Sequence, residues 1–397
     1  MSSEIKNRKP ANTAFKQQRL KAWQPILTPK TVLPTLFIVG ILFAPLGGLL
    51  LYASDNVSEL VIDYTNCAGA SDTYQYMPSN AFSAAFPGTS KIPVPQYRVE
   101  TVPLGPNPNV TISRCYIKLD IPVTLKPPVF LYYKLTNFFQ NHRRYVKSFD
   151  VNQLKGTPVD VATLENSNCK PLATTTDGTN PGNRIAIYPC GLIANSMFND
   201  TISNFVLLNI PGGAQADNET YAFGAKGIAW ASDAQKYKKS GYTDLTQIRP
   251  PPNWAVRYPN GMYTPEFPPP DISQDEHFQV WMRTAGLPNF RKLYGRNDSA
   301  TMKEGKYEVV IDMNFDVKRY GGTKAIVIST VSFLGGRNPF LGIAYIAVGV
   351  ACVVLGALFT ARHLYKPRKL GDHTYLSWNQ TAHANPAGGP NFSLTER

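Results

Sequence analysis

Residues 31–54 read TVLPTLFIVGILFAPLGGLLLYAS, and none of these twenty-four side chains carries a charge. A second uncharged stretch of the same length, residues 338–361, reads NPFLGIAYIAVGVACVVLGALFTA. About 20 apolar residues in a helix suffice to cross the ~30 Å hydrocarbon core of a bilayer. The sequence therefore predicts two transmembrane helices, at 31–54 and 338–361, on either side of a large middle segment.

The basic residues gather in the two tails. Residues 1–30 contain seven Lys or Arg against one acidic residue, and residues 362–397 contain five against two. Basic flanks mark the cytosolic side of a membrane, so we expect both tails in the cytosol and residues 55–337 in the lumen or exterior. The first apolar run is longer than a signal-peptide core, which favours an uncleaved anchor over a signal peptide. The tails carry +6 and +3 of the net charge of +13. This division of the positive charge argues against nucleic-acid binding, which needs basic residues on one face.

Cysteine usage agrees with an extracytoplasmic middle segment. Four of the five cysteines lie there, and the fifth, Cys352, lies in the second span. An even number in an oxidising compartment is typical of disulfides. Four cysteines allow three pairings, and we expect the sequential pairs Cys67–Cys115 and Cys169–Cys190, because each closes a loop that can form locally. A zinc site is disfavoured, since the segment has no Cys-x-x-Cys and no neighbouring histidine pair.

The middle segment also carries Asn-x-Ser/Thr sequons, the acceptor pattern for N-glycosylation. We expect glycans on four asparagines: Asn109, Asn199, Asn218 and Asn297. Asn56 fits the pattern as well, but it is so close to the first span that we expect it to stay unmodified.

Apolar and polar side chains alternate over residues 115–125 and 307–317. A period of two indicates strands with one buried face. Further strands are expected at 128–135, 184–188, 204–210 and 324–334. Antiparallel sheets with one covered face suit this alternation, and two such sheets bury their faces by forming a sandwich. The predicted fold is therefore an antiparallel β-sandwich with helical insertions, flanked by two transmembrane helices.

Helical insertions are expected at residues 136–150 and 273–285, where apolar side chains recur with helical spacing. Two stretches rich in Pro and Gly, 68–108 and 249–271, are expected to form extended loops without regular structure.

Common enzyme motifs are missing from the sequence. It has no Gly-x-Ser-x-Gly, Gly-x-Gly-x-x-Gly, Gly-x-x-x-x-Gly-Lys-Ser/Thr or His-Glu-x-x-His. The string Gly321-Gly-Thr-Lys324 has the wrong spacing for a phosphate loop and precedes a predicted strand, which favours a turn. We therefore expect a non-catalytic protein without a cofactor or a metal site.

His142-Arg143-Arg144 forms the most conspicuous basic cluster of the middle segment. Such a cluster can bind an anion or a lipid headgroup. The favoured alternative is that the arginines pair with acids of the same domain, for example Asp150.

Small residues recur along both spans. The second span has a glycine every seven residues, at Gly342, Gly349 and Gly356, and the first has Gly40, Gly47 and Gly48. A stripe of small residues lets another helix approach closely in lipid. This pattern predicts either contact with a partner's helix or packing of the two spans on each other, and the sequence leaves both open.

Several long strings carry a family resemblance. They are NTAFKQQR at 12–19, YYKLTNF at 132–138, PCGLIANS at 189–196, WMRTAGLP at 281–288 and GGRNPFLGIAY at 335–345. With these strings the chain resembles the accessory (β) subunits of type IV P-type ATPases, the phospholipid flippases, known as the cell-division-control protein 50 or ligand-effect modulator family.

The resemblance implies a non-catalytic subunit in a 1:1 complex with the ATPase catalytic subunit, which hydrolyses ATP and moves phospholipid to the cytosolic leaflet. It implies that the accessory chain permits export from the endoplasmic reticulum towards the Golgi, endosomes or plasma membrane, and supports the transport cycle. The family ectodomain is an antiparallel β-sandwich with helical insertions, and two sequential disulfides are its pattern in fungal-type members. Glycosylation carries over best at Asn199.

Partner contacts are expected at the basic N-terminal tail and at the glycine stripe, through Phe15, Lys16, Arg19, Trp23, Gly342, Gly349 and Gly356. The tail can also lie on anionic membrane lipids. The alternative function is that of a stand-alone cell-surface receptor or adhesion glycoprotein.

Overall fold

The computed structural model describes residues 11–21, 27–88, 91–104, 107–176, 182–208, 219–331 and 335–367. The chain forms two units. One comprises Tyr52–Pro339, called here the middle domain, and the other comprises the two terminal segments, Met1–Leu51 and Phe340–Arg397.

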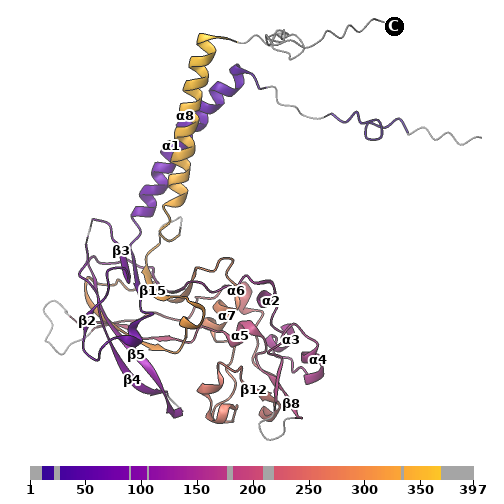
Figure 1. The fold of residues 1–397 in the computed structure, drawn as a ribbon, viewed down its shortest axis with the longest axis vertical. Coiled ribbons are helices and arrows are strands. Elements are labelled where there is room, and N and C mark those ends of the chain that lie inside the picture. The colour runs from indigo at the N-terminus through magenta and orange to yellow at the C-terminus, as the bar shows by residue number, and fades with distance from the viewer. Residues whose placement is uncertain are drawn as a thin grey trace, which may run out of the picture. The chain divides into compact units, whose positions relative to one another are not determined.

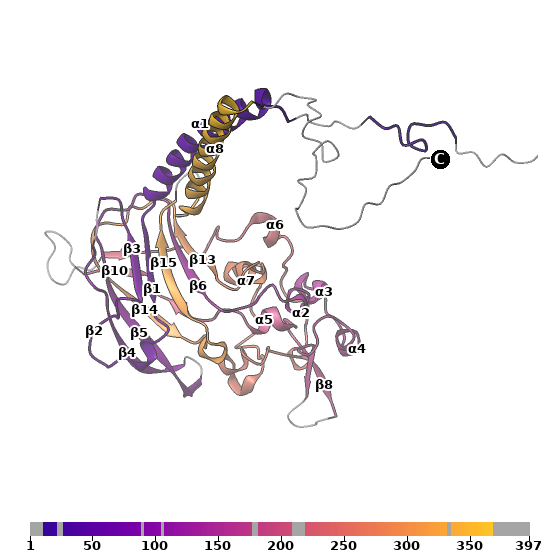
Figure 2. The same cartoon turned by 45° about the horizontal axis from the view of Figure 1, so that its top comes forward.

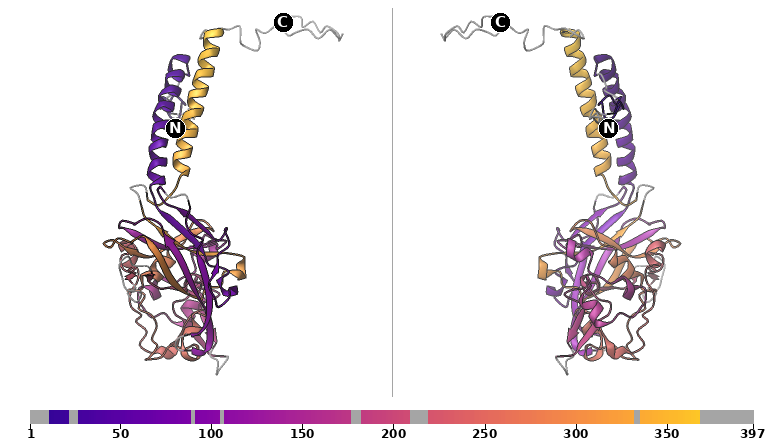
Figure 3. Two further views of the ribbon diagram at one scale, coloured as in Figure 1. Left: turned by 90° about the vertical axis from the view of Figure 1, so that its left-hand side faces the viewer. Right: turned by 90° about the vertical axis from the view of Figure 1, so that its right-hand side faces the viewer.

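The terminal unit contains most of α1 (Pro29–Asp55) and all of α8 (Phe340–Tyr365), two long helices that lie side by side (Figures 1 and 3). Both are long and apolar enough to cross a membrane. Each extends past the uncharged stretch that predicted it, because Lys30 and Arg362 continue the helix. The start of α8 is two residues later than the sequence predicted, since Pro339 disfavours a helical conformation at the residue before it.

The middle domain contains two antiparallel sheets. The first has the order β13-β6-β15-β1-β3. Its strands are β1 (Glu59–Asp63), β3 (Phe82–Ala85), β6 (Val129–Leu135), β13 (Phe290–Asn297) and β15 (Lys324–Ser329). The second has the order β11-β10-β14-β5-β4-β2, with β9 paired to β14. Its strands are β2 (Gln75–Tyr76), β4 (Gln96–Leu104), β5 (Asn107–Ile121), β9 (Thr201–Ile202), β10 (Phe205–Leu207), β11 (Glu219–Tyr221) and β14 (Gly305–Met313).

The two sheets bury their facing sides in one apolar core (Figure 2). Ile62 of β1 and Ile328 of β15 contribute from the first sheet, and Ile117 of β5 and Val309 of β14 contribute from the second. Along β14 the buried positions alternate with partly exposed ones, as the period of two predicted. The expected antiparallel sandwich is therefore the architecture of this domain.

A second core lies beneath short helices and a small sheet. The helices are α2 (Arg143–Val146), α3 (Val151–Leu154), α4 (Val161–Glu165), α5 (Leu192–Asn195), α6 (Ala231–Ala234) and α7 (Glu276–Met282). The sheet comprises β7 (Thr174–Thr176), β8 (Arg184–Ile187) and β12 (Ile248–Arg249), with β12 parallel to β8. Single turns of 3-10 helix are η1 (Cys67–Gly69), η2 (Leu245–Gln247), η3 (Ala255–Arg257), η4 (Pro259–Gly261) and η5 (Lys318–Tyr320).

Strand β6 joins the two cores. Val129 and Leu131 belong to the sandwich core, whereas Tyr133 and Leu135 belong to the helical core, where the Tyr133 ring stacks on Phe198 at 3.9 Å between centroids. The strand thus anchors the helical insertions on the sandwich, which makes the middle domain one packed body.

Two predictions of secondary structure were wrong. A helix over 136–150 is reduced to α2, because Asn137 adopts a positive φ of 56° and its backbone N–H bonds the Asn289 side chain, so the chain turns before the helix can begin. The stretch 68–108 is not an irregular loop, since it contains β2, β3 and the nine-residue β4. Pro and Gly surround β4, but its pairing with β5 overrides them.

Candidate functional site

The glycines of both spans lie where α1 and α8 touch. A methyl group added to Gly342 would lie 2.9 Å from the carbonyl oxygen of Gly47, and one added to Gly349 would lie 2.9 Å from the amide nitrogen of Ala44. At Gly356 the same methyl group would meet the Phe37 ring at 3.1 Å. The stripe of α8 therefore packs against α1 of the same chain, which is one of the two alternatives that the sequence left open.

Other residues of the spans face away from this contact. A methyl group added to Gly48 would meet nothing within 4 Å, and Ile41 and Leu42 of α1 and Val350 and Leu358 of α8 are exposed. A partner helix would reach these outer faces without disturbing the glycine contact.

The tail residues proposed for partner contact lie in a short turn. Phe15 is 77% exposed, the backbone N–H of Lys16 donates to Thr13 Oγ1, and the guanidinium of Arg19 donates to Asn12 Oδ1. Trp23 lies outside the described residues.

Both disulfides of the middle domain join the sequential pairs expected from the sequence. Cys67–Cys115 ties η1 to β5, with 6.0 Å between the Cα atoms. Cys169–Cys190 ties the turn after α4 to the residue two positions before α5, with 5.6 Å between the Cα atoms. Cys352 of α8 is a free cysteine.

The four sequons differ in their surroundings. Asn109 lies in β5, and Asn218 lies outside the described residues. The Asn199 side chain is half-buried and makes no hydrogen bond within the described parts of the chain. Both polar atoms of the Asn297 side chain are hydrogen-bonded: Nδ2 donates to the Ala222 carbonyl at 2.8 Å, and Oδ1 accepts from the Ala300 amide at 2.8 Å. The amide nitrogen that would receive a glycan is thus unengaged at Asn199 and engaged at Asn297.

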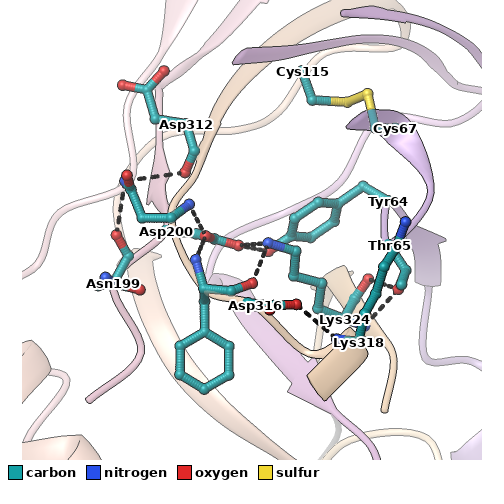
Figure 4. Close-up of polar contacts among 12 residues, drawn as sticks. Tyr64, Thr65, Cys67, Cys115, Asn199, Asp200, Asp312, Asp316, Lys318 and Lys324 are labelled. Carbon is teal, nitrogen blue, oxygen red and sulfur yellow. Dashed lines mark hydrogen bonds and ion pairs between the residues drawn. A yellow bond between two sulfur atoms is a disulfide. The ribbon is translucent and has the colours of Figure 1, made fainter. Parts of the chain in front are cut away.

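An ion pair is buried directly beside Asn199 (Figure 4). Asp200 precedes β9 of the second sheet, and Lys324 begins β15 of the first. Lys324 Nζ lies 2.7 Å from Asp200 Oδ2, and the two side chains are 4% and 0% exposed. Tyr64 Oη donates to the same carboxylate oxygen at 2.9 Å. The pair therefore links the two sheets.

Backbone groups complete this buried site. Asp200 Oδ1 accepts from the amides of Asn314 and Phe315 at 2.5 and 2.6 Å, and Lys324 Nζ also donates to the Phe315 carbonyl at 2.7 Å. Burial raises the pKa of Tyr64 well above its usual value, and the neighbouring Asp200 charge raises it further. A buried charge needs such partners, because without them its desolvation is not compensated.

Sequence reasoning missed this site. Lys324 was noted only as the end of a Gly-Gly-Thr-Lys string, and the structure does place a turn there, with Gly321 at a φ of +65°. The available signal was a lysine at the start of a strand whose next four residues are apolar. Nothing in the sequence near Asp200 indicates its partner.

The basic cluster of His142, Arg143 and Arg144 is exposed at the start of α2. The favoured explanation, pairing with acids such as Asp150, was wrong: Asp150 Oδ1 accepts from the Gln153 amide and caps α3. Neither arginine takes part in an ion pair with another described residue.

The described residues contain no group of three His, Cys, Asp or Glu side chains that could hold a metal ion. On the surface near α7, the Arg283 guanidinium stacks over the Trp230 ring at 3.7 Å.

Comparison with known proteins bears on the whole chain. Residues 50–369 match the model of the LEM3 (ligand-effect modulator 3) family / CDC50 family. A phospholipid-transporting ATPase accessory subunit CDC50 from Chaetomium thermophilum is 42% identical over 95% of this chain and 93% of its own length. The phospholipid-transporting ATPase accessory subunit LEM3 of Saccharomyces cerevisiae is 38% identical over 94% and 88%, respectively.

The similarity extends to animals. Cell cycle control protein 50A from Bos taurus is 39% identical over 91% of both chains. The matched region contains both disulfides, the buried ion pair and helix α8. The chain is a member of the LEM3/CDC50 family.

Proposed function

We propose that this chain is the non-catalytic accessory subunit of a phospholipid-transporting P-type ATPase. The observation that carries the proposal is similarity over nearly the full length to proteins named as accessory subunits of such ATPases. The chain pairs 1:1 with the catalytic subunit, permits its export from the endoplasmic reticulum towards the Golgi, endosomes or plasma membrane, and supports the flipping of phospholipid towards the cytosolic leaflet.

The proposed topology places both tails in the cytosol and the middle domain on the opposite side of the membrane. The basic flanks of both spans support it. Two disulfides in the middle domain support it as well, because disulfides persist in oxidising compartments.

The preformed helix pair suggests how the spans meet the catalytic subunit. Because Gly342, Gly349 and Gly356 contact α1, they act on the partner through the geometry of the pair, while the outer faces of α1 and α8 make the direct contact. On the cytosolic side, Phe15, Lys16, Arg19 and Trp23 contact the partner, and the exposed Phe15 supplies an apolar anchor.

Purification of the tagged chain from its own membranes in mild detergent, followed by mass spectrometry, tests this function. We expect a catalytic subunit of about a hundred kilodaltons, phosphorylated on aspartate during ATP turnover, in stoichiometric amount. Recovery of the chain alone, or with a soluble ligand bound to the middle domain, would instead support the alternative of a receptor or adhesion glycoprotein.

The topology has its own test. We expect Asn199→Gln to remove one endoglycosidase-sensitive glycan, because the Asn199 amide is unengaged, and Asn297→Gln serves as the comparison at a sequon whose amide is bonded. A middle domain that is unglycosylated and open to protease from the cytosolic side would refute the proposed orientation.

A further inference from the structure

A pocket of about 410 Å³ lies between the C-terminal end of α7, the segment before α6 and strand β13, which is the edge strand of the first sheet. Helices α6 and α7 lie beside each other in Figures 1 and 2. Three cations, Arg283, Arg291 and Lys292, line this space, called here the α7 pocket, together with one acid, Asp233. The lining therefore carries an excess of positive charge.

Three hydrogen-bond donors of the lining have no acceptor. The Arg283 guanidinium stacks on the Trp230 ring and lies 3.7 Å from Asp233 Oδ2, which is too far for a hydrogen bond. The hydroxyls of Tyr132 and Thr284 make no hydrogen bond to another described residue. Donors that converge on a cationic pocket without acceptors are suited to an oxyanion, since hydrogen bonds to a charged acceptor are the stronger ones.

The charge of Lys292 is buried without an acidic partner. Nζ donates to the carbonyls of Val280, Trp281 and Arg283 at 3.0, 2.8 and 2.5 Å, and the residue is 7% exposed. None of the ion pairs between described residues includes Lys292. Burial and the nearby Arg283 charge lower the pKa of Lys292 to about 7. Because its three N–H groups are all used, Lys292 offers an anion a charge and not a hydrogen bond.

Contacts that a ligand would not have to break fix the walls of the α7 pocket. The Glu276 carboxylate accepts from the amides of Gly227, Ile228 and Ala229 at 3.1, 2.8 and 2.9 Å, which holds the segment before α6 on the start of α7. The three bonds of Lys292 hold the other end of α7 on β13. A preformed pocket spares a ligand the cost of ordering its walls.

Arg291 places the α7 pocket near the ends of the spans. Its guanidinium lies 2.6 Å from Glu59 Oε2, and a Cβ at Gly336 would collide with it. Glu59 is four residues after the end of α1, and Gly336 is four residues before the start of α8. Four residues extend over at most about 14 Å, so the headgroups of membrane lipids come within reach of this edge of the pocket.

We propose that the α7 pocket binds a phosphate ester, with the phosphate oxygens on Arg283, Tyr132 and Thr284. Lys292 lies behind them and compensates the charge. The donors come from β6 and from the segment after α7, and the tetrahedral oxygens of a phosphate can reach them from one position, whereas the oxygens of a carboxylate lie in one plane with its carbon. The headgroup of a phospholipid and a soluble phosphate ester present the same chemistry to these donors. This site does not rest on the proposed function.

Thermal unfolding of the full-length chain, expressed without a catalytic subunit and purified in dodecyl maltoside, tests the site through tryptophan fluorescence at constant ionic strength. The probes are dioleoylphosphatidic acid, glycerophosphate and dioleoylglycerol, which carries no phosphate. We expect phosphatidic acid to raise Tm in a saturable way, because a ligand that binds only the folded state stabilises it, and dioleoylglycerol to leave Tm unchanged. An equal shift with glycerophosphate assigns the ester to solution, and a shift with the lipid alone assigns it to the membrane.

Two double variants show whether the shift comes from this pocket. Tyr132→Phe/Thr284→Val removes both unpartnered hydroxyls and no charge, and we expect it to raise the concentration of phosphate ester at the half-maximal shift about tenfold. Tyr76→Phe/Thr101→Val removes two exposed hydroxyls outside the α7 pocket and should leave that concentration unchanged. An unaltered Tm without probe shows that each variant is folded. No shift with either phosphate ester, or the same half-maximal concentration in both double variants, would overturn the proposed site.

Discussion

Replacing Lys324 by methionine should severely destabilise the middle domain. The substitution keeps the apolar stem of the side chain but removes the ammonium group, which lies 2.7 Å from Asp200 Oδ2 and 2.7 Å from the Phe315 carbonyl. Asp200, 0% exposed, would then have only neutral hydrogen-bond donors around it, the Tyr64 hydroxyl and the amides of Asn314 and Phe315.

The expected magnitude follows from burial. Removing one partner of a buried ion pair costs about 3–5 kcal/mol. Each kcal/mol lowers Tm by about 2–4 °C for domains of 150–250 residues, and the lower value applies to this larger domain, so we expect a fall of about 6–10 °C. Arg114→Met is the matched control, because the Arg114–Asp312 pair is equally short at 2.6 Å but is 35% and 23% exposed. Exposed pairs contribute about 0–1 kcal/mol.

Thermal unfolding of the full-length protein in detergent, followed by tryptophan fluorescence, measures both variants. The double variant Asp200→Asn/Lys324→Met should be less destabilised than the two single losses added together, because neither change then leaves a buried charge without a partner. If Lys324→Met lowers Tm no more than Arg114→Met does, the buried pair is not what holds the two sheets together.

Three further changes test other parts of the structure. Gly349→Leu should force α8 away from α1 and reduce recovery of the catalytic subunit. Ala351→Leu, on the exposed side of α8, should leave that recovery unchanged. Equal recovery with both variants would show that assembly does not need this helix contact. Cys169→Ser should remove roughly 3 kcal/mol of stabilisation and cause the protein to be retained in the endoplasmic reticulum, which glycan maturation measures. Cys352→Ser, at a free cysteine, is the control. Normal export of the Cys169→Ser variant would contradict a structural role for the disulfide. Burial lowers the pKa of His277 in the folded domain, so the unfolded chain binds a proton more readily and stability should fall as the pH drops below about 6.5. His277→Gln should therefore flatten the dependence of Tm on pH between pH 7.5 and 5.5. An unchanged dependence would exclude His277 as its source.

The spans and the main strands were predictable because their signals are local. A bilayer requires about 20 uncharged apolar residues in succession, and 31–54 supplies them with no reference to the rest of the chain. The strand at 307–317 was likewise visible, since alternating burial records which face meets the core. Its end was misplaced by four residues, because β14 stops at Met313 where pairing with β5 stops.

The missed features depend on contacts distant in sequence. Asp200 and Lys324 are 124 residues apart, and neither has a neighbour in sequence that reveals the other. The helix over 136–150 failed because the Asn137 amide bonds Asn289, which is 152 residues away. The arginines of α2 were expected to pair with Asp150 because they are close to it in sequence. Asp150 instead caps α3 by accepting a hydrogen bond from the Gln153 amide.

Packing of the glycine stripe within the chain changes how recognition of a partner should be divided. In lipid, helices associate mainly through close contact at small residues, and here Gly40 and Gly47 already meet Gly349 and Gly342. The small residues of the spans are thus used in the contact between α1 and α8. The outer faces bear larger side chains, such as Ile41 and Leu358, which allow a partner helix to pack less closely. In the proposed complex, much of the selectivity for a catalytic subunit must then come from outside the bilayer.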